Sequence, residues 1–78
     1  MAIEYKTITI PYFVDGEFSC KVSYLLDLYD RLECSTVLTS DIDWTVSEYL
    51  KSHEYIRSYF GISYITRSGK EFFEELSK

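Results

Sequence analysis

The chain has 78 residues, of which 46% are hydrophobic and 18% aromatic, and its formal net charge is −5. This length allows one domain, residues 1–78, with a small core, because so short a chain buries only about 60–65% of its unfolded surface. The composition excludes a disordered chain. No apolar run approaches the roughly 20 residues of a membrane span, and the first residues do not form a signal peptide, so we expect a cytoplasmic protein.

Acidic and basic residues are distributed unevenly along the sequence. Residues 1–50 contain nine acidic and three basic residues, whereas residues 51–70 contain four basic residues and one acidic residue. Residues 71–78 are acidic again, with a net charge of −2. This asymmetry is the most informative electrostatic feature of the sequence.

Residues 5–24 predict a β-hairpin, because β-branched and aromatic residues alternate on either side of Asp15-Gly16. That pair suits the positive φ angles of a type I′ turn. Pro11 lacks the N–H that a strand ladder needs, so we expect it at an edge or a bulge.

The hydrophobic spacing then changes to that of a helix. Its predicted inner face consists of Val22, Leu25, Leu26, Tyr29 and Leu32. Asp27 and Arg31 lie four residues apart on the opposite face, and we expect them to form an ion pair.

The middle of the chain predicts a second helix, which Ser40 or Asp41 is expected to cap. Its predicted inner positions are Val46, Tyr49, Leu50 and His53. The preceding segment, residues 35–40, fits either a short helix or a loop.

The last third predicts two strands around Phe60-Gly61 and then a closing helix. Ser68 and Glu71 have the spacing of a capping box at the start of this helix. Its predicted apolar face consists of Phe72, Phe73 and Leu76.

Several short patterns occur in a fixed order. Thr45-Val46-Ser47 with Leu50 is similar to a recognition-helix pattern, Tyr55-Ile56 to the pair that opens a first wing strand, and Gly61 to the glycine near a wing tip. Residues 64–69, "YITRSG", are similar to the "YxLTxxG" that ends a second wing strand. From about Ser40 to Leu76 the chain therefore resembles the winged helix-turn-helix family.

The fold that we expect is α+β: a small winged-helix-like domain with an N-terminal β-hairpin, three or so helices and a two-stranded wing. The resemblance implies the helices and the wing, and the hairpin would be an addition to the minimal fold. Each of these elements offers one apolar face, and together they can enclose a small core. The alternative is another α+β arrangement, with the hairpin and the strands of residues 56–66 in one antiparallel sheet.

The resemblance also implies a DNA-binding transcriptional regulator, as a homodimer on duplex DNA. The helix would read bases and the basic segment would follow phosphates. The residues expected to bind nucleic acid in this hypothesis are Thr45, Ser47, Lys51, Arg57, Tyr59, Arg67 and Lys70.

The predicted recognition helix departs from the family because it is acidic, with Asp41, Asp43 and Glu48 against Lys51 alone. Such a helix repels duplex DNA, so we favour binding to a basic protein surface, as found on nucleic-acid-binding proteins. In size and charge the chain is similar to small acidic phage inhibitors, anti-CRISPR proteins among them. The predicted protein-binding residues are Asp27, Asp30, Glu33, Asp41, Asp43, Glu48, Tyr24 and Trp44.

No catalytic, metal or cofactor motif is recognisable. His53 is the only histidine, and no nucleophile motif adjoins it. Cys20 and Cys34 lack metal-ligand spacing. We expect reduced, half-buried thiols, and the alternative is a disulfide between them. We therefore do not expect an enzyme. A third hypothesis is a structural subunit that packs against other chains through an exposed apolar patch.

Overall fold

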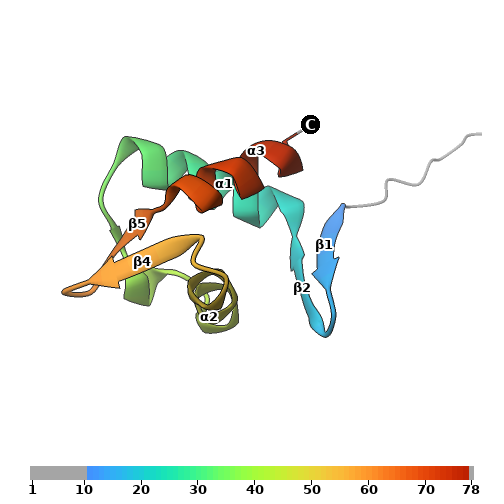
Figure 1. Ribbon diagram of the computed structural model, residues 1–78, viewed down its shortest axis with the longest axis horizontal. Coiled ribbons are helices and arrows are strands. Elements are labelled where there is room, and N and C mark those ends of the chain that lie inside the picture. The colour runs from blue at the N-terminus through green and yellow to red at the C-terminus, as the bar shows by residue number, and fades with distance from the viewer. Residues whose placement is uncertain (1–10, 78) are drawn as a thin grey trace, which may run out of the picture.

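The computed structural model describes residues 11–77 as an α+β fold (Figure 1). Helices α1 and α3 lie side by side, the three-stranded sheet and α2 lie below them, and a two-stranded hairpin lies at one end. The elements in chain order are β1 (Tyr12–Asp15), β2 (Phe18–Lys21), α1 (Val22–Cys34), β3 (Val37–Leu38), the 3₁₀ turn η1 (Thr39–Asp41), α2 (Trp44–Ser52), β4 (Ile56–Tyr59), β5 (Ile62–Ile65) and α3 (Arg67–Leu76).

The N-terminal hairpin is present, but its turn differs from the prediction. Asp15 pairs with Phe18, so the two loop residues are Gly16 and Glu17 rather than Asp15 and Gly16. Only the first of the two, Gly16, has a positive φ (64°), which fits a type II′ turn rather than the predicted type I′ turn. Pro11 precedes β1, and its carbonyl accepts a hydrogen bond from the Val22 amide at 3.0 Å. The predicted strand residues 5–10 lie outside the described residues.

Helix α1 forms where the spacing predicted it, and it buries Leu25 and Leu28 completely or nearly so. Leu28 was not on the predicted inner face, because the centre of the buried arc lies between Leu25 and Leu28. The expected ion pair between Asp27 and Arg31 is wrong: both side chains are exposed, and no such pair forms among residues 11–77. Solvent screening leaves exposed pairs at this spacing little net attraction.

Residues 35–41 form a short strand followed by a 3₁₀ turn. Val37 and Leu38 of β3 pair with Ser63 and Ile62 of β5, which gives an antiparallel sheet with the order β3-β5-β4. The sheet therefore has three strands, one more than the two predicted from residues 56–66. The alternative fold is wrong, because β1 and β2 form a separate sheet.

Helix α2 begins two residues later than a cap at Asp41 would require and three later than a cap at Ser40, because its cap is Asp43. The Asp43 carboxylate accepts a hydrogen bond from the Thr45 amide at 3.0 Å. His53 is the C-terminal cap of α2 and is exposed, so its predicted inner position is wrong.

Thr66 caps α3, in place of the predicted Ser68. Its Oγ1 accepts from the Gly69 amide at 3.0 Å and donates to the carbonyl of Glu54 at 2.6 Å, which ties the start of α3 to the start of β4. A Cβ at Gly69 would overlap the carbonyl oxygen of Tyr55. Glycine at this position therefore permits the close contact between α3 and the chain entering β4.

The core of the fold, which we call the aliphatic core, lies between α1, α2, α3 and the inner face of the three-stranded sheet. Its residues are at most 5% exposed. They are Leu25, Leu28, Val37, Ile42, Val46, Leu50, Ile56 and Phe73.

A second packed region, which we call the aromatic cluster, joins the hairpin to α2 and α3. Its rings are Phe13, Phe18, Tyr49, Tyr55 and Phe72. Phe18 stacks on Tyr49 with ring centroids 4.2 Å apart, and Tyr55 stacks on Phe72 at 4.3 Å. These side chains are partly exposed, whereas those of the aliphatic core are not.

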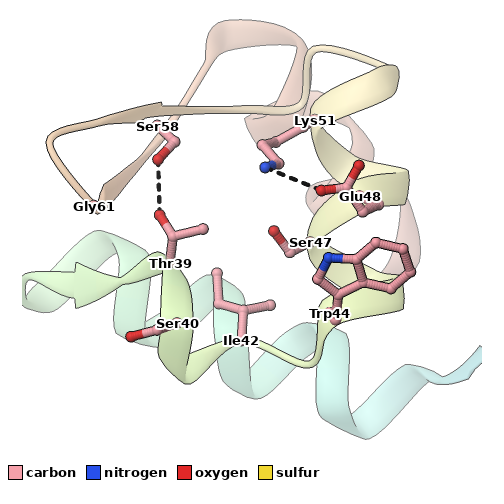
Figure 2. Close-up of a pocket in the computed structure, with 9 residues that line it drawn as sticks. All are labelled: Thr39, Ser40, Ile42, Trp44, Ser47, Glu48, Lys51, Ser58 and Gly61. Atoms are coloured by element: carbon pink, nitrogen blue, oxygen red, sulfur yellow. Dashed lines mark hydrogen bonds and ion pairs between the residues drawn. The ribbon is translucent and has the colours of Figure 1, made fainter.

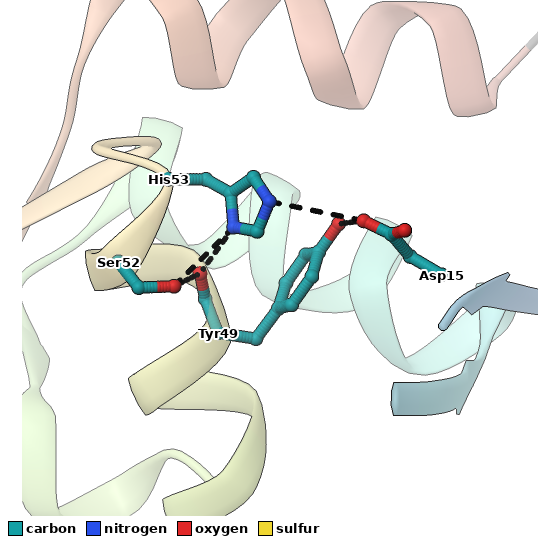
Figure 3. A network of polar contacts seen from close by, with 4 residues as sticks. All are labelled: Asp15, Tyr49, Ser52 and His53. Atoms are coloured by element: carbon teal, nitrogen blue, oxygen red, sulfur yellow. Dashed lines mark hydrogen bonds and ion pairs between the residues drawn. The ribbon is translucent and has the colours of Figure 1, made fainter. Parts of the chain in front are cut away.

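The hydroxyl of Tyr49 connects this cluster to the turn of the hairpin (Figure 3). It donates to Asp15 Oδ2 at 2.6 Å, and His53 Nε2 lies 3.7 Å from the same oxygen. Burial, together with this hydrogen bond, raises the pKa of Tyr49 above its ordinary value. The hairpin is thus attached to α2 by stacked rings and by the polar contacts of Tyr49 and His53 with Asp15.

Candidate binding surface

The N-terminus of α2 is organised by Asp43. Its carboxylate accepts hydrogen bonds from the Thr45 hydroxyl at 2.6 Å and from the Thr45 amide at 3.0 Å. Hydrogen bonds from the Thr45 side chain, the Thr45 amide and the Val46 amide lower the pKa of Asp43. Asp43 therefore stays ionised at neutral pH, and its negative charge is a permanent feature of this end of the helix.

Tyr24 of α1 also contacts this end of α2. Its hydroxyl oxygen accepts a hydrogen bond from the Asp43 amide at 2.9 Å. Asp27 and Arg31 follow Tyr24 at three and seven positions along α1, so they lie along the same edge of that helix. Both side chains are exposed.

Trp44 is the first residue of α2, and 73% of its surface is exposed. It stands at the rim of a groove of about 560 Å³ between α2, η1 and the tip of the β4–β5 hairpin (Figure 2). The α2 wall of the groove also includes Ser47, Glu48 and Lys51, and Ile42 contributes an apolar side chain. Much of the indole surface remains in solvent beside this groove.

The polar groups of the groove are largely satisfied within the chain. Lys51 Nζ lies 3.2 Å from Glu48 Oε2, so these two charges on α2 offset one another. Thr39 Oγ1 lies 2.9 Å from Ser58 Oγ and 2.8 Å from Ser63 Oγ, which holds η1 to the sheet. The groove is therefore nearly neutral inside.

The structure brings part of the predicted protein-binding set together. Asp41 ends η1, Asp43 caps α2, and Trp44 and Glu48 are the first and fifth residues of that helix. All four are exposed, and Glu48 is paired with Lys51. Asp27, three residues after Tyr24 on α1, is exposed as well. Together these five residues form what we call the acidic Trp44 surface.

The remaining members of that set lie elsewhere or are partly engaged. Asp30 points away from the core on the outer side of α1, as its helical position requires. Glu33 faces α3, where its carboxylate lies 3.7 Å from Lys70 Nζ. Tyr24 is half-buried and its hydroxyl is bonded to Asp43, so it offers only part of its ring to a partner.

The residues predicted to bind nucleic acid do not form one surface. Ser47 is only 3% exposed, and the hydroxyl of Thr45 is bonded to Asp43. Lys51 and Lys70 are paired with carboxylates of α2 and α1, respectively. The other members are exposed on β4 and at the start of α3: Arg57, Tyr59 and Arg67.

The part of the chain that the structure describes shows no group of three or more metal-ligating side chains, and it has no helix long and apolar enough to cross a membrane. Cys20 and Cys34 are both free. Cys20 is half-buried, as expected, and burial together with the nearby Asp43 raises its pKa. Cys34 is exposed instead, because it is the last residue of α1.

Comparison of the chain with models of protein families, with curated proteins and with solved structures finds no match in any of the three. The groove beside Trp44 was not predicted from the sequence. Its far side consists of residues 39–42 and of the hairpin tip, and no local pattern in the sequence predicts that the 3₁₀ turn faces α2.

Proposed function

We propose that this domain is a non-enzymatic binding module that engages a basic protein surface through the acidic Trp44 surface. The observation that carries the proposal is the 73% exposure of Trp44 among carboxylates. Tryptophan is enriched among residues that dominate binding energy, because it supplies a large and rigid contact area. Carboxylates around it steer association toward a cationic partner.

The partner class follows from this charge. Basic protein surfaces most often belong to proteins that handle nucleic acid, and an acidic domain can place carboxylates where phosphates would lie. In size and charge the chain is similar to small acidic phage inhibitors of the anti-CRISPR type. An inhibitor of a nucleic-acid-handling machine is therefore the form of this function that we favour.

For the fold, we propose the finer description of a winged-helix-like domain. The order α1, β3, α2, β4 and β5, with the strand order β3-β5-β4, supports it. The β4–β5 hairpin then takes the place of the wing. The 3₁₀ turn η1 stands where a helix-turn-helix motif has its first helix.

A second candidate is a winged-helix transcriptional regulator that binds duplex DNA as a homodimer, and the order of elements favours it. Helix α2 would have to enter the major groove. Its acidic residues oppose that approach, because the groove is flanked by phosphates. Titration with mixed-sequence duplex DNA at about 50 mM salt tests this candidate, and binding that weakens steeply with added salt would favour it.

The protein-binding proposal is tested by capture on the immobilised domain from a nuclease-treated lysate. We expect a partner that is retained at low salt and released as salt rises, because screening weakens contacts between exposed charges. Trp44→Ala and the double variant Asp41→Lys/Glu48→Lys should each lose that partner. Asp43 is left unchanged, because its carboxylate caps α2.

Two matched variants control this experiment. Glu17→Lys/Glu71→Lys makes the same change in net charge at exposed positions on the hairpin turn and on α3, and Tyr12→Ala removes an exposed ring from β1. Both should retain the partner. Equal retention of that partner by the Asp41→Lys/Glu48→Lys variant would reject the acidic Trp44 surface as the binding site.

A further inference from the structure

The three-stranded sheet has one buried face and one face that no other described element covers. In an antiparallel sheet, directly paired residues lie on the same face. The pair Ile56–Ile65 and the pair Ser58–Ser63 therefore share the inner face with Val37. The residues of the outer sheet face are Leu38, Arg57, Tyr59, Ile62 and Tyr64.

This outer sheet face is apolar and aromatic although it lies in solvent. Leu38 is 47% exposed, Tyr59 56% and Tyr64 51%. The rings of Tyr59 and Tyr64 lie on neighbouring strands with centroids 6.1 Å apart. Phe60, at the tip of the same hairpin, is fully exposed. Three aromatic rings are thus presented along one hairpin.

The charge of this face is opposite to that of the chain as a whole. Residues 35–40 and 55–66, which include all three strands, contain no acidic residue, whereas the chain has a net charge of −5. Arg57 lies directly across from Tyr64 in the ladder, and Arg67 follows β5. Within residues 11–77, neither arginine forms an ion pair with a carboxylate.

A shallow hollow of about 220 Å³ adjoins this surface at the edge of the sheet, before the start of β3. Residues 62–65 of β5, Tyr64 among them, line it on the sheet side, Leu32 lines it from α1, and Ser35 and Thr36 bring hydroxyl groups from the loop after α1. The hollow therefore combines a ring face with hydrogen-bonding groups. A nucleobase is recognised by these two kinds of group, because its flat face stacks on an aromatic ring and its polar edge forms hydrogen bonds.

We propose that the outer sheet face binds single-stranded nucleic acid, with bases stacked on Tyr59 and Tyr64 and a phosphate at Arg57. Charge complementarity selects this occupant, because within residues 11–77 the unpaired cation of Arg57 and no anion stand among the exposed rings, and the second unpaired cation, Arg67, follows β5 at the start of α3. Stacking on aromatic side chains requires unpaired bases, so the strand must be single. This site is separate from the acidic Trp44 surface and goes beyond the proposed function.

The test measures fluorescence anisotropy of labelled oligo(dT) and oligo(U), twelve nucleotides long, with the full chain. We expect binding at about 50 mM salt, with a slope of log K against log salt of about −1.4 if both arginines contact phosphates. Tyr64→Leu keeps an apolar side chain but removes the aromatic ring, and it should weaken binding about tenfold. Arg57→Gln should reduce the magnitude of the salt slope by about 0.7.

Tyr12→Leu and Arg31→Gln are the matched controls, because they change an exposed tyrosine on β1 and an exposed arginine on α1. Both should bind as the unmodified chain does. The proposal is overturned if the oligonucleotides do not bind at about 100 μM protein, or if Tyr12→Leu weakens binding as much as Tyr64→Leu. Equal binding of a duplex of the same length, or displacement of the strand by an acidic peptide at equal concentration, also overturns it.

Discussion

The aliphatic core and the aromatic cluster are built from neighbouring residues but differ in their relation to water. Phe73 of α3 is fully buried in the aliphatic core, and it stacks on Tyr29 with centroids 5.2 Å apart. Phe72, the preceding residue, is partly exposed in the aromatic cluster. The aliphatic core holds the helices to the sheet, whereas the cluster attaches the hairpin. The difference teaches that the hairpin is the more weakly attached part of the fold.

The largest expected effect comes from truncating the two phenylalanines in turn. Phe73→Ala should lower the free energy of unfolding by about 3–5 kcal/mol, because it removes a buried ring and leaves a cavity. Phe72→Ala should lower it by about half as much, because part of that ring already contacts water. Urea unfolding followed by far-UV circular dichroism measures both values. Equal losses would contradict the distinction between the two regions.

Gly69→Ala should perturb both regions together, because α3 carries both phenylalanines. The new Cβ would overlap the Tyr55 carbonyl, so α3 must move away from the start of β4. We expect a loss of about 2–3 kcal/mol in the free energy of unfolding. The control is Ser68→Ala at the neighbouring exposed position, which should change stability little. An equal effect of both variants would show that the close contact at Gly69 is not required.

The smallest expected effect is Tyr49→Phe, which removes the hydroxyl bond to Asp15 and keeps the stacked ring. This variant should lower the free energy of unfolding by only about 0.5–1 kcal/mol at neutral pH, because Asp15 is half-exposed. Folding raises the pKa of Tyr49. Above about pH 10 the unfolded chain therefore loses this proton before the folded chain does, and stability falls as pH rises.

Tyr49→Phe should make that alkaline loss of stability smaller than it is in the unmodified chain. Urea unfolding between about pH 7 and about pH 11 measures it. Tyr12→Phe, at an exposed tyrosine of β1, serves as the control and should leave the alkaline slope unchanged. Identical slopes for Tyr49→Phe and the unmodified chain would contradict the role of this hydroxyl.

Much of the fold was predictable because local signals and packing agree. The spacing of Leu25, the turn at Gly61 and the pair Phe72-Phe73 each specify an element type, and each element forms as expected. The caps were predicted less well. Ser68 and Thr66 are both suitable caps, and the choice of Thr66 depends on its hydroxyl reaching the Glu54 carbonyl, a contact between residues twelve positions apart. Sequence spacing cannot reveal such a contact.

The candidate surfaces were predictable only in part, for the same reason. Trp44 and its neighbouring acids are close in sequence, so their grouping followed directly. The sequence did not predict that Lys51 and Lys70 are paired while Arg57, within the described part of the chain, is free of carboxylates. That difference depends on the carboxylates that α2 and α1 place beside the two lysines. The outer sheet face likewise required the register of β4 and β5, which places Arg57 beside Tyr64.

The tip of the β4–β5 hairpin carries Phe60 at φ 52° and Gly61 at φ 77°, the geometry of a type I′ turn. Asparagine suits the first of these positions far better, and Phe60 makes no compensating contact because it is fully exposed. Phenylalanine is therefore not the residue that stability alone favours at this position. A library of all substitutions at position 60 can be screened once for heat tolerance and once for binding of single-stranded nucleic acid. Substitutions that raise heat tolerance but weaken binding would show that Phe60 serves binding at a cost in stability.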